Sequence, residues 1–547
     1  MVPDRVPRLA GALRTLETGR FAEAAAAAAA LLAEDAADTE ARLLLGLARG
    51  AAGAAEAAAA LLDQVARARP DCAHPCHDLA ALLRRLGRAD QASAQYRAAL
   101  AHAPADAALR RGFAGHLLEA GDAPAALAAL DPADDSAAAH HLRGLALAEQ
   151  DDFAAAAEAF RATVARDPAP ADGWSNLGMM LRAEARFDAA IAAHDQAVAR
   201  APQVPQIRVN RAVALLHAGR FTEAWAEYEW RLRLPGHTPL PPGRLLPDLA
   251  TAGDLRGRTI LLTHEEGFGD TLQFVRYAPL LAARGARVIL ALPPPLMRLL
   301  APLAPVVPLA GPLPDHDYHC PFFSLPRAFA TTLNTIPAAI PYLVADPALV
   351  ASWAARLAAE APDGGGGLRV GLVWAGQARP WLRGFATLDR RRSAALADFA
   401  PLAGLAGVRF ISLQAGPPAA EAASPPPGLA LRDPMAEVRD FADTAAVIAG
   451  LDLVVSVDTA VVHLAGALGT PAFLLDRTDS CWRWLSGRDD SPWYPRTRIF
   501  RQERSGDWTG PMRRVAAAIA AWAGPGAGPG AGSGAGSGAD PGGAPAL

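Results

Sequence analysis

The feature that most constrains the fold is an alanine that returns at a fixed interval through the first 235 residues. It recurs every 34 residues at Ala24, Ala58, Ala92 and Ala126, then after 30 residues at Ala156, and after 34 each at Ala190 and Ala224. Turn sequences such as Gly19-Arg-Phe21 and Gly219-Arg-Phe221 precede several of these alanines. Glycine supplies backbone conformations that other residues resist. A period of this length predicts helical pairs that stack on one another.

Apolar residues within one unit share helical faces, as Trp174, Leu177, Gly178 and Leu181 do. This helix–turn–helix pattern resembles the tetratricopeptide repeat. We therefore expect an array of about seven repeats over residues 1–235, with a concave face that binds protein partners. The fifth unit is four residues short, which predicts an irregularity near residues 127–150.

Composition limits the chemistry that the chain can use. The chain has no lysine, so its 52 cationic residues are all arginine, and its net charge is −4. This balance does not favour nucleic acid as a partner. A phosphate site would have to use arginine, histidine or backbone N–H groups.

Cysteine and histidine gather in "DCAHPCHD", residues 71–78, where Cys72, His74, Cys76 and His77 lie close together. The repeat phase places Cys76 at a core position, and a second paired cluster is missing, so we expect no metal site. Four cysteines in 547 residues do not form a disulfide framework. We also expect no signal peptide, no membrane span and a cytoplasmic location.

After about residue 257 short apolar strands alternate with helical stretches, which predicts parallel α/β sheets. We expect a linker over 236–256, one Rossmann-like half over 257–350, a hinge over 351–367 and a second half over 368–522. A Gly-rich tail, 523–547, is predicted to be disordered. The expected strands are Thr259–Thr263, Val288–Leu292, Leu368–Trp374, Val408–Leu413 and Leu453–Val457.

Three motifs follow predicted strands: "HEEGFGDTLQF" (264–274), "SVDTAVVHLAGALGTP" (456–471) and "WAGQARPWLRGFATLDRRRSAAL" (374–396). In the first, Asp270 is either a helix cap or a functional acid. In the second, N–H groups of Thr459, Ala460 and Val461 begin a helix and favour an anion, with His463 one turn on. In the third, the arginines at 390–392 are either phosphate ligands or a solvated charge run.

Together these segments resemble the bacterial glycosyltransferase family 9 with its heptosyltransferases, most of all the subset fused behind tetratricopeptide repeats. The layout is also similar to that of the O-linked N-acetylglucosamine transferases, whose repeats precede a GT-B domain of two Rossmann-like halves. The segments 265–288, 457–471 and 481–508 carry the resemblance. It implies an inverting, metal-independent glycosyltransferase that uses a nucleotide sugar and no other cofactor, with a protein or glycan acceptor recruited by the repeats.

The resemblance also implies roles for individual residues. Asp270 would be the catalytic base, with Glu265, Gly267 and Gly269 at the acceptor. The residues that would hold the nucleotide sugar are Asp458, Thr459, Ala460, His463, Arg392 and Gln414.

Some residues depart from the pattern of the family. The chain lacks the lysine common at the phosphates, Ala460 replaces a frequent glycine, and Cys481 replaces a frequent aspartate. A catalytically degenerate scaffold or binding protein is therefore the alternative, and an enzyme acting on a lipid-linked or surface polysaccharide is a third possibility. Trp482, Trp484, Trp493 and Tyr494 either stack on a ligand or form a packed core.

Overall fold

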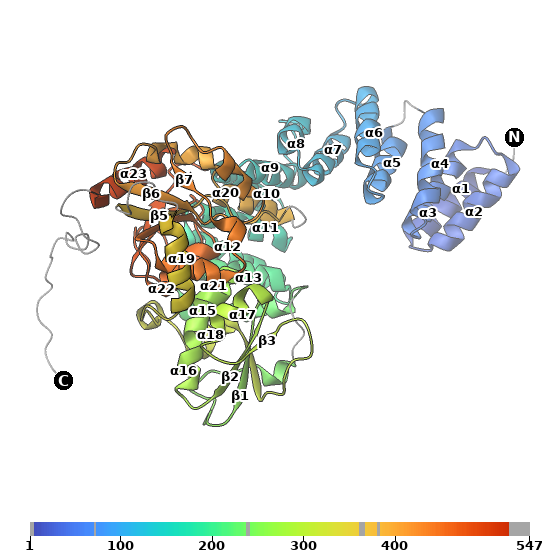
Figure 1. Cartoon of the computed structure of the whole chain (residues 1–547). Helices are drawn as coiled ribbons and strands as arrows, with labels where there is room; N and C mark the ends of the chain where they lie inside the picture. Colours follow the sequence, from blue (N-terminus) through green and yellow to red (C-terminus); the bar gives the residue numbers. More distant parts are fainter. Residues whose placement is uncertain (1–4, 70–72, 237–240, 360–366, 380–382, 524–547) are drawn as a thin grey trace, which may run out of the picture. The chain divides into compact units, whose positions relative to one another are not determined.

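The computed structural model describes residues 5–69, 73–236, 241–359, 367–379 and 383–523 (Figure 1). The chain forms two compact units. The first contains residues 1–184 and 192–202, and the second contains residues 185–191 and 203–547.

The N-terminal part is a series of antiparallel helical pairs (Figure 1). Its described residues form fourteen α-helices: α1 (Arg5–Glu17), α2 (Phe21–Glu34), α3 (Thr39–Ala51), α4 (Ala55–Ala68), α5 (Ala73–Arg85), α6 (Ala89–His102), α7 (Ala107–Ala120), α8 (Ala123–Ala129), α9 (Ala137–Glu149), α10 (Phe153–Arg166), α11 (Ala171–Ala183), α12 (Phe187–Arg200), α13 (Pro205–His217) and α14 (Phe221–Tyr228). The seven predicted repeats are thus present as seven helical pairs.

The turn inside each pair has one residue with a left-handed backbone. These residues are Gly19, Gly53, Gly87, Gly121, Asp151, Ala185 and Gly219. They follow the same spacing as the recurring alanines, and a left-handed backbone carries little cost only in glycine. The period therefore reflects one turn geometry that every pair repeats.

Small residues let the two helices of a pair lie close together. A Cβ atom added to Gly178 would come within 2.7 Å of the His194 ring, and one added to Gly144 within 2.7 Å of the Phe160 ring. The recurring alanine is also fully buried, as at Ala156 and Ala190. The predicted irregularity is a shortened helix, because α8 has 7 residues where α10 has 14.

The α/β part contains two parallel sheets. The first has the order β3-β2-β1-β4 and the second the order β10-β9-β8-β5-β6-β7. The strands are β1 (Thr259–Thr263), β2 (Arg287–Leu292), β3 (Val306–Pro308), β4 (Tyr318–Pro321), β5 (Leu368–Val373), β6 (Val408–Ser412), β7 (Leu431–Arg432), β8 (Leu453–Val457), β9 (Ala472–Asp476) and β10 (Thr497–Arg501). Parallel sheets of this kind are covered on both faces and have apolar central strands, as in the fully buried β8.

Nine α-helices surround these strands in the described part of the chain (Figure 1). They are α15 (Phe268–Phe274), α16 (Ala278–Ala282), α17 (Pro294–Leu300), α18 (Leu325–Ala328), α19 (Pro347–Ala359), α20 (Arg383–Arg392), α21 (Phe441–Ala449), α22 (Ala460–Leu468) and α23 (Thr509–Ala523). Helix α19 occupies the first part of the predicted hinge, whose residues 360–366 lie outside the described residues, as does the predicted tail from residue 524.

The seventh helical pair packs against the α/β part, although the sequence groups it with the repeats. The His217 ring bonds to the Ser480 carbonyl over 3.1 Å, and the Trp225 indole donates to the Thr331 carbonyl over 2.8 Å. The Phe221 ring lies 6.0 Å from the Trp482 ring. Helices α13 and α14 therefore pack against segments that connect the strands of the α/β part.

The predicted fold class is confirmed: a helical repeat solenoid precedes an α/β part with parallel sheets. A membrane-spanning helix would need a long apolar run, and none of the described helices has one.

Candidate functional site

Two helices that begin at the carboxyl ends of β1 and β8 meet at their first turns. A Cβ atom at Gly269 of α15 would lie 2.7 Å from the His463 ring and 3.4 Å from the Ala460 Cα of α22. Gly269 thus makes room for a neighbouring helix, whereas the sequence assigned that space to an acceptor. Carboxyl ends of parallel strands are where α/β proteins bind ligands. This junction is the candidate site.

Asp270 lies at the junction in the first turn of α15. One of its carboxylate oxygens accepts the Gly267 N–H over 2.8 Å, and the other pairs with Arg483. A Cβ atom at Gly267 would lie 3.0 Å from the first oxygen, so the glycine permits this cap. Burial raises the pKa of Asp270, while Arg483 lowers it.

Arg483 joins the segment that follows β9 to helix α15, which follows β1, and sequence reasoning missed it. It belongs to the 3-10 helix Trp482–Trp484, and besides Asp270 it donates to the Gln273 amide oxygen over 2.7 Å and to the Cys481 sulfur over 3.0 Å. A cation between two tryptophans was the available signal. Of the two alternatives that the sequence left open for the tryptophans, Trp482 and Trp484 follow the second, because both are buried in packed core.

Glu265 is held in a buried ion pair. Its carboxylate accepts two hydrogen bonds from Arg231, of 2.7 and 3.1 Å, and one from the Phe323 N–H over 2.9 Å. Arg231 is 1% exposed and lies just after the last repeat helix. The sequence analysis placed Glu265 at the acceptor. In the structure its carboxylate is held by Arg231 and orients the turn after β1.

Helix α22 begins with Thr459 as its cap. The Thr459 hydroxyl accepts the Val461 N–H over 3.3 Å, which occupies one of the N–H groups that the sequence analysis assigned to an anion. Ala460 is the first helical residue, and Asp458 precedes the cap. A nine-residue helix still presents the positive end of its dipole at this point.

His463 is packed inside the junction and carries no charge at neutral pH. Its Nδ1 lies 3.0 Å from the Tyr494 hydroxyl, its Nε2 lies 3.8 Å from Asp458, and its ring stacks on Trp484. Burial lowers the pKa of His463 to about 3. Positive charge for a diphosphate would have to come from arginine.

Two arginines supply that charge beside Asp458. Arg392 pairs with Asp389 at 2.8 Å and donates to the Asp458 carbonyl over 3.5 Å. Arg477, 8% exposed, pairs with Asp479 at 2.8 Å and interacts electrostatically with Asp458. Arg392, which the sequence analysis assigned to the nucleotide sugar, lies next to the start of α22, and that assignment stays a prediction. Arg477 was missed.

Gln414 does not face the site. Its side-chain oxygen accepts the N–H groups of Trp374 and Ala375, and its side-chain nitrogen donates to the carbonyls of Ala375 and Ala415. It is 2% exposed, and its amide group is fully used. Gln414 therefore ties the ends of β5 and β6 together, and its role toward a nucleotide sugar stays a prediction.

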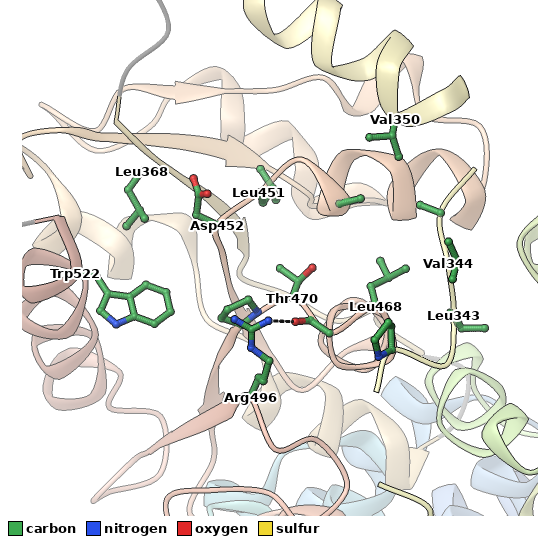
Figure 2. Close-up of a pocket in the computed structure, with 15 residues that line it drawn as sticks. Leu343, Val344, Val350, Leu368, Leu451, Asp452, Leu468, Thr470, Arg496 and Trp522 are labelled. Carbon is green, nitrogen blue, oxygen red and sulfur yellow. Dashed lines mark hydrogen bonds between the residues drawn. The ribbon is translucent and has the colours of Figure 1, made fainter. Parts of the chain in front are cut away.

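A cavity of about 460 Å³ lies at the opposite edge of the second sheet (Figure 2). It is lined by residues at the amino ends of strands, such as Leu368, Asp452 and Thr470, with Trp522 and Arg496 at its wall. Arg496 donates to the Gly469 carbonyl over 2.8 Å. Asp458 follows the carboxyl end of β8, so this cavity is separate from the candidate site.

The cysteine and histidine cluster at 71–78 is only partly described. Cys72 and the side chains of His74 and Cys76 lie outside the described residues, and the His77 ring lies 5.7 Å from the Tyr96 ring. Within the described residues, no group of three or more His, Cys, Asp or Glu side chains could hold a metal ion.

Family models match both the repeat region and the α/β part of the chain. A tetratricopeptide repeat model matches residues 141–205 and 181–229, and the glycosyltransferase family 9 (heptosyltransferase) model matches residues 437–503. Protein FlbA of Caulobacter vibrioides is 29% identical over 509 residues, which cover 86% of this chain and 76% of FlbA. The short second match contains Asp458, His463 and Arg483.

Solved structures of repeat proteins are also similar to part of this chain. The Cut9–Hcn1 hetero-tetramer of the APC/C aligns at 16% identity over 42% of this chain and 46% of the other, with a TM-score of 0.35. Pseudomonas aeruginosa pilF aligns at 20% identity over 36% and 92%, with a TM-score of 0.33. The two family models thus match separate stretches of the chain, tetratricopeptide repeats before residue 230 and glycosyltransferase family 9 after residue 436.

Proposed function

We propose that this protein transfers a sugar from a nucleotide sugar to a protein or glycan acceptor, with inversion at the anomeric carbon. One observation carries the proposal: the first turns of α15 and α22 touch, which brings carboxylates beside an arginine-lined helix start. The glycosyltransferase family 9 match supports a glycosyltransferase.

The chemistry needs two kinds of group in one place. The acceptor hydroxyl must lose a proton to a base as it attacks, and the departing nucleoside diphosphate must have its negative charge stabilised. Carboxylates of the turn after β1 meet the first need. Arg392, Arg477 and the start of α22 meet the second, in a chain that has no lysine to offer.

The repeats would supply the acceptor. Tetratricopeptide arrays bind peptides and proteins along a concave face. In this proposal the array recruits a protein, or a glycan that a protein carries, and the nucleotide sugar is a substrate instead of a resident cofactor.

The first test is release of nucleoside diphosphate from a panel of UDP-, GDP-, ADP- and dTDP-sugars, with cell lysate as the source of acceptor. Binding of UDP, GDP, ADP and dTDP is measured in parallel by calorimetry. Turnover of one donor, together with binding of its diphosphate, supports the transferase. Binding of no nucleotide, together with no turnover, supports the alternative of a scaffold.

A matched pair of variants on α20 tests the phosphate site. Arg392→Gln removes a guanidinium next to Asp458, and we expect it to weaken diphosphate binding about tenfold or more, because a charged hydrogen bond contributes about 1.5–3 kcal/mol. Arg390→Gln removes an exposed cation from the same helix and should change the dissociation constant less than about twofold. Equal effects of the two variants would place the phosphates elsewhere.

A further inference from the structure

The turn between β1 and α15 contains a glutamate in an unusual backbone conformation. Glu266 has φ +57°, in the left-handed region that residues with a Cβ rarely adopt. Gly267, the neighbouring residue, caps the helix with an ordinary φ of −105°. An outlier of this kind persists only where the surrounding structure imposes it, and such outliers gather at functional sites.

The segment just after the last repeat helix holds the residue next to Glu266. Arg231, from the 3-10 helix Glu229–Arg233, holds both oxygens of Glu265, and the Phe323 N–H binds the same carboxylate. Arg231 is itself fixed by Glu229 at 2.9 Å and by the Ser324 hydroxyl at 2.9 Å. With Glu265 turned inward and anchored, its neighbour Glu266 is turned outward.

The two carboxylates at the junction differ in what surrounds them. Both oxygens of Asp270 are engaged, one by the Gly267 N–H and one by Arg483, and its side chain is 17% exposed. Glu266 is exposed, and the hydrogen bond that it accepts from the Tyr228 hydroxyl is long, 3.5 Å. Glu266 can reach a substrate without first giving up a strong partner.

We propose that Glu266 is the general base of this enzyme and that Asp270 positions Arg483. The inference rests on the function proposed above. The acceptor oxygen forms a bond to the anomeric carbon, and the bond from that carbon to the diphosphate oxygen breaks. The bonding pair leaves with the nucleoside diphosphate, and the hydroxyl proton passes to the Glu266 carboxylate.

The charges around Glu266 suit this role. Part of the Glu266 residue reaches solvent, but the protein atoms packed around its carboxylate desolvate that group. This desolvation, with Asp270 and Glu265 nearby, raises the pKa of Glu266 to about 7, although Arg231 and Arg483 act in the opposite direction. Tyr228, the remaining titratable neighbour, is uncharged at this pH because burial raises its pKa. A general base acts best when its pKa lies near the working pH.

The test compares pH profiles of three variants with the wild type, using the nucleotide sugar that the panel identifies. Glu266→Gln should lower kcat about 100-fold or more and remove the fall in rate below pH 7, while the matching nucleoside diphosphate binds within about threefold of the wild type. Asp270→Asn should lower kcat but keep that fall. Glu503→Gln changes an exposed glutamate that pairs with Arg514. It should leave both kcat and the fall in rate below pH 7 unchanged.

The outcomes separate this inference from the proposed function. If Glu266→Gln keeps the rate and pH profile of the wild type while Asp270→Asn loses the acid limb, Asp270 is the base and the inference is overturned. If the wild type neither binds any of the four diphosphates nor turns over a donor, the proposed function itself fails. Calorimetry of the folded variants distinguishes a lost proton acceptor from a lost fold.

Discussion

At the scale of single residues, the α/β part buries charge that is only partly compensated. Asp476, the last residue of β9, is fully buried. It pairs with Arg501 at 3.0 Å and accepts the Ser480 hydroxyl over 2.6 Å. Burial nevertheless raises the pKa of Asp476 from 3.8 to about 6. The folded protein therefore binds a proton here more tightly than the unfolded chain does.

This shift makes stability depend on pH in a defined window. The contribution of a protonated Asp476 is complete below about pH 4 and is lost as the pH rises through about 6, which amounts to about 3 kcal/mol. Asp476→Asn should remove this dependence. Urea unfolding of both proteins at several pH values checks it: the wild type should lose about 2 kcal/mol relative to the variant between pH 4 and 7. A constant difference would contradict the prediction.

At the scale of elements, the turns of the repeats show where the chain tolerates strain. Ala185 occupies the left-handed position that glycine fills at Gly87 and Gly219, with φ +57°. The residue is exposed, so a change there leaves packing intact. A left-handed alanine costs about 1–2 kcal/mol, which glycine avoids.

We therefore expect Ala185→Gly to stabilise the protein by about 1 kcal/mol. Ala192→Gly, at an exposed position inside α12, is the control and should destabilise by about 1 kcal/mol. A higher urea midpoint for Ala185→Gly and a lower one for Ala192→Gly would support strain at residue 185. Lower midpoints for both variants would refute it.

Elements were predictable where local pattern decides them. The strands β1 and β8 match their predicted bounds, since each is a short apolar run next to a helical pattern. The strand β4 was missed, because its four residues include a proline and its pairing with β1 joins residues 58 positions apart. Sequence cannot show such pairing.

The site follows the same division. The motif around Asp270 and the start of α22 could be predicted, because turn and cap residues mark them locally. The pairing of Glu265 with Arg231 could not, since Arg231 belongs to the repeat region and carries no local signal. The hydrogen bonds of Gln414 could not be predicted for the same reason, because its partners just after β5 lie 39 and 40 residues away.

At the scale of the whole molecule, the last helical pair is part of the α/β core. Phe221 and Trp225 are each 2% exposed, and the Trp225 ring lies 5.5 Å from the Trp482 ring. Trp482 in turn precedes Arg483, the partner of Asp270. Removal of this helical pair would expose the Trp482 ring, which lies next to Arg483 of the candidate site.

Two fragments test this organisation. A fragment of residues 236–547 lacks the pair, and we expect it to aggregate or to bind a hydrophobic dye, because losing several buried aromatic residues costs more than the usual stability of about 5–15 kcal/mol. A fragment of residues 185–547 keeps the pair and should unfold cooperatively. Cooperative unfolding of both, followed by circular dichroism in urea, would refute the shared core.

The anchored pair also sets where such a protein can be recombined. A repeat array of another length or specificity can be joined upstream of Pro205, because the helices before that point make no part of the turn that bears Glu265 and Glu266. A crossover after Tyr228 would separate Arg231 from helices α13 and α14. The ion pair between Arg231 and Glu265, which holds the turn, would then be weakened. In a lineage that shuffles repeat arrays, the seventh pair would be inherited with the α/β part.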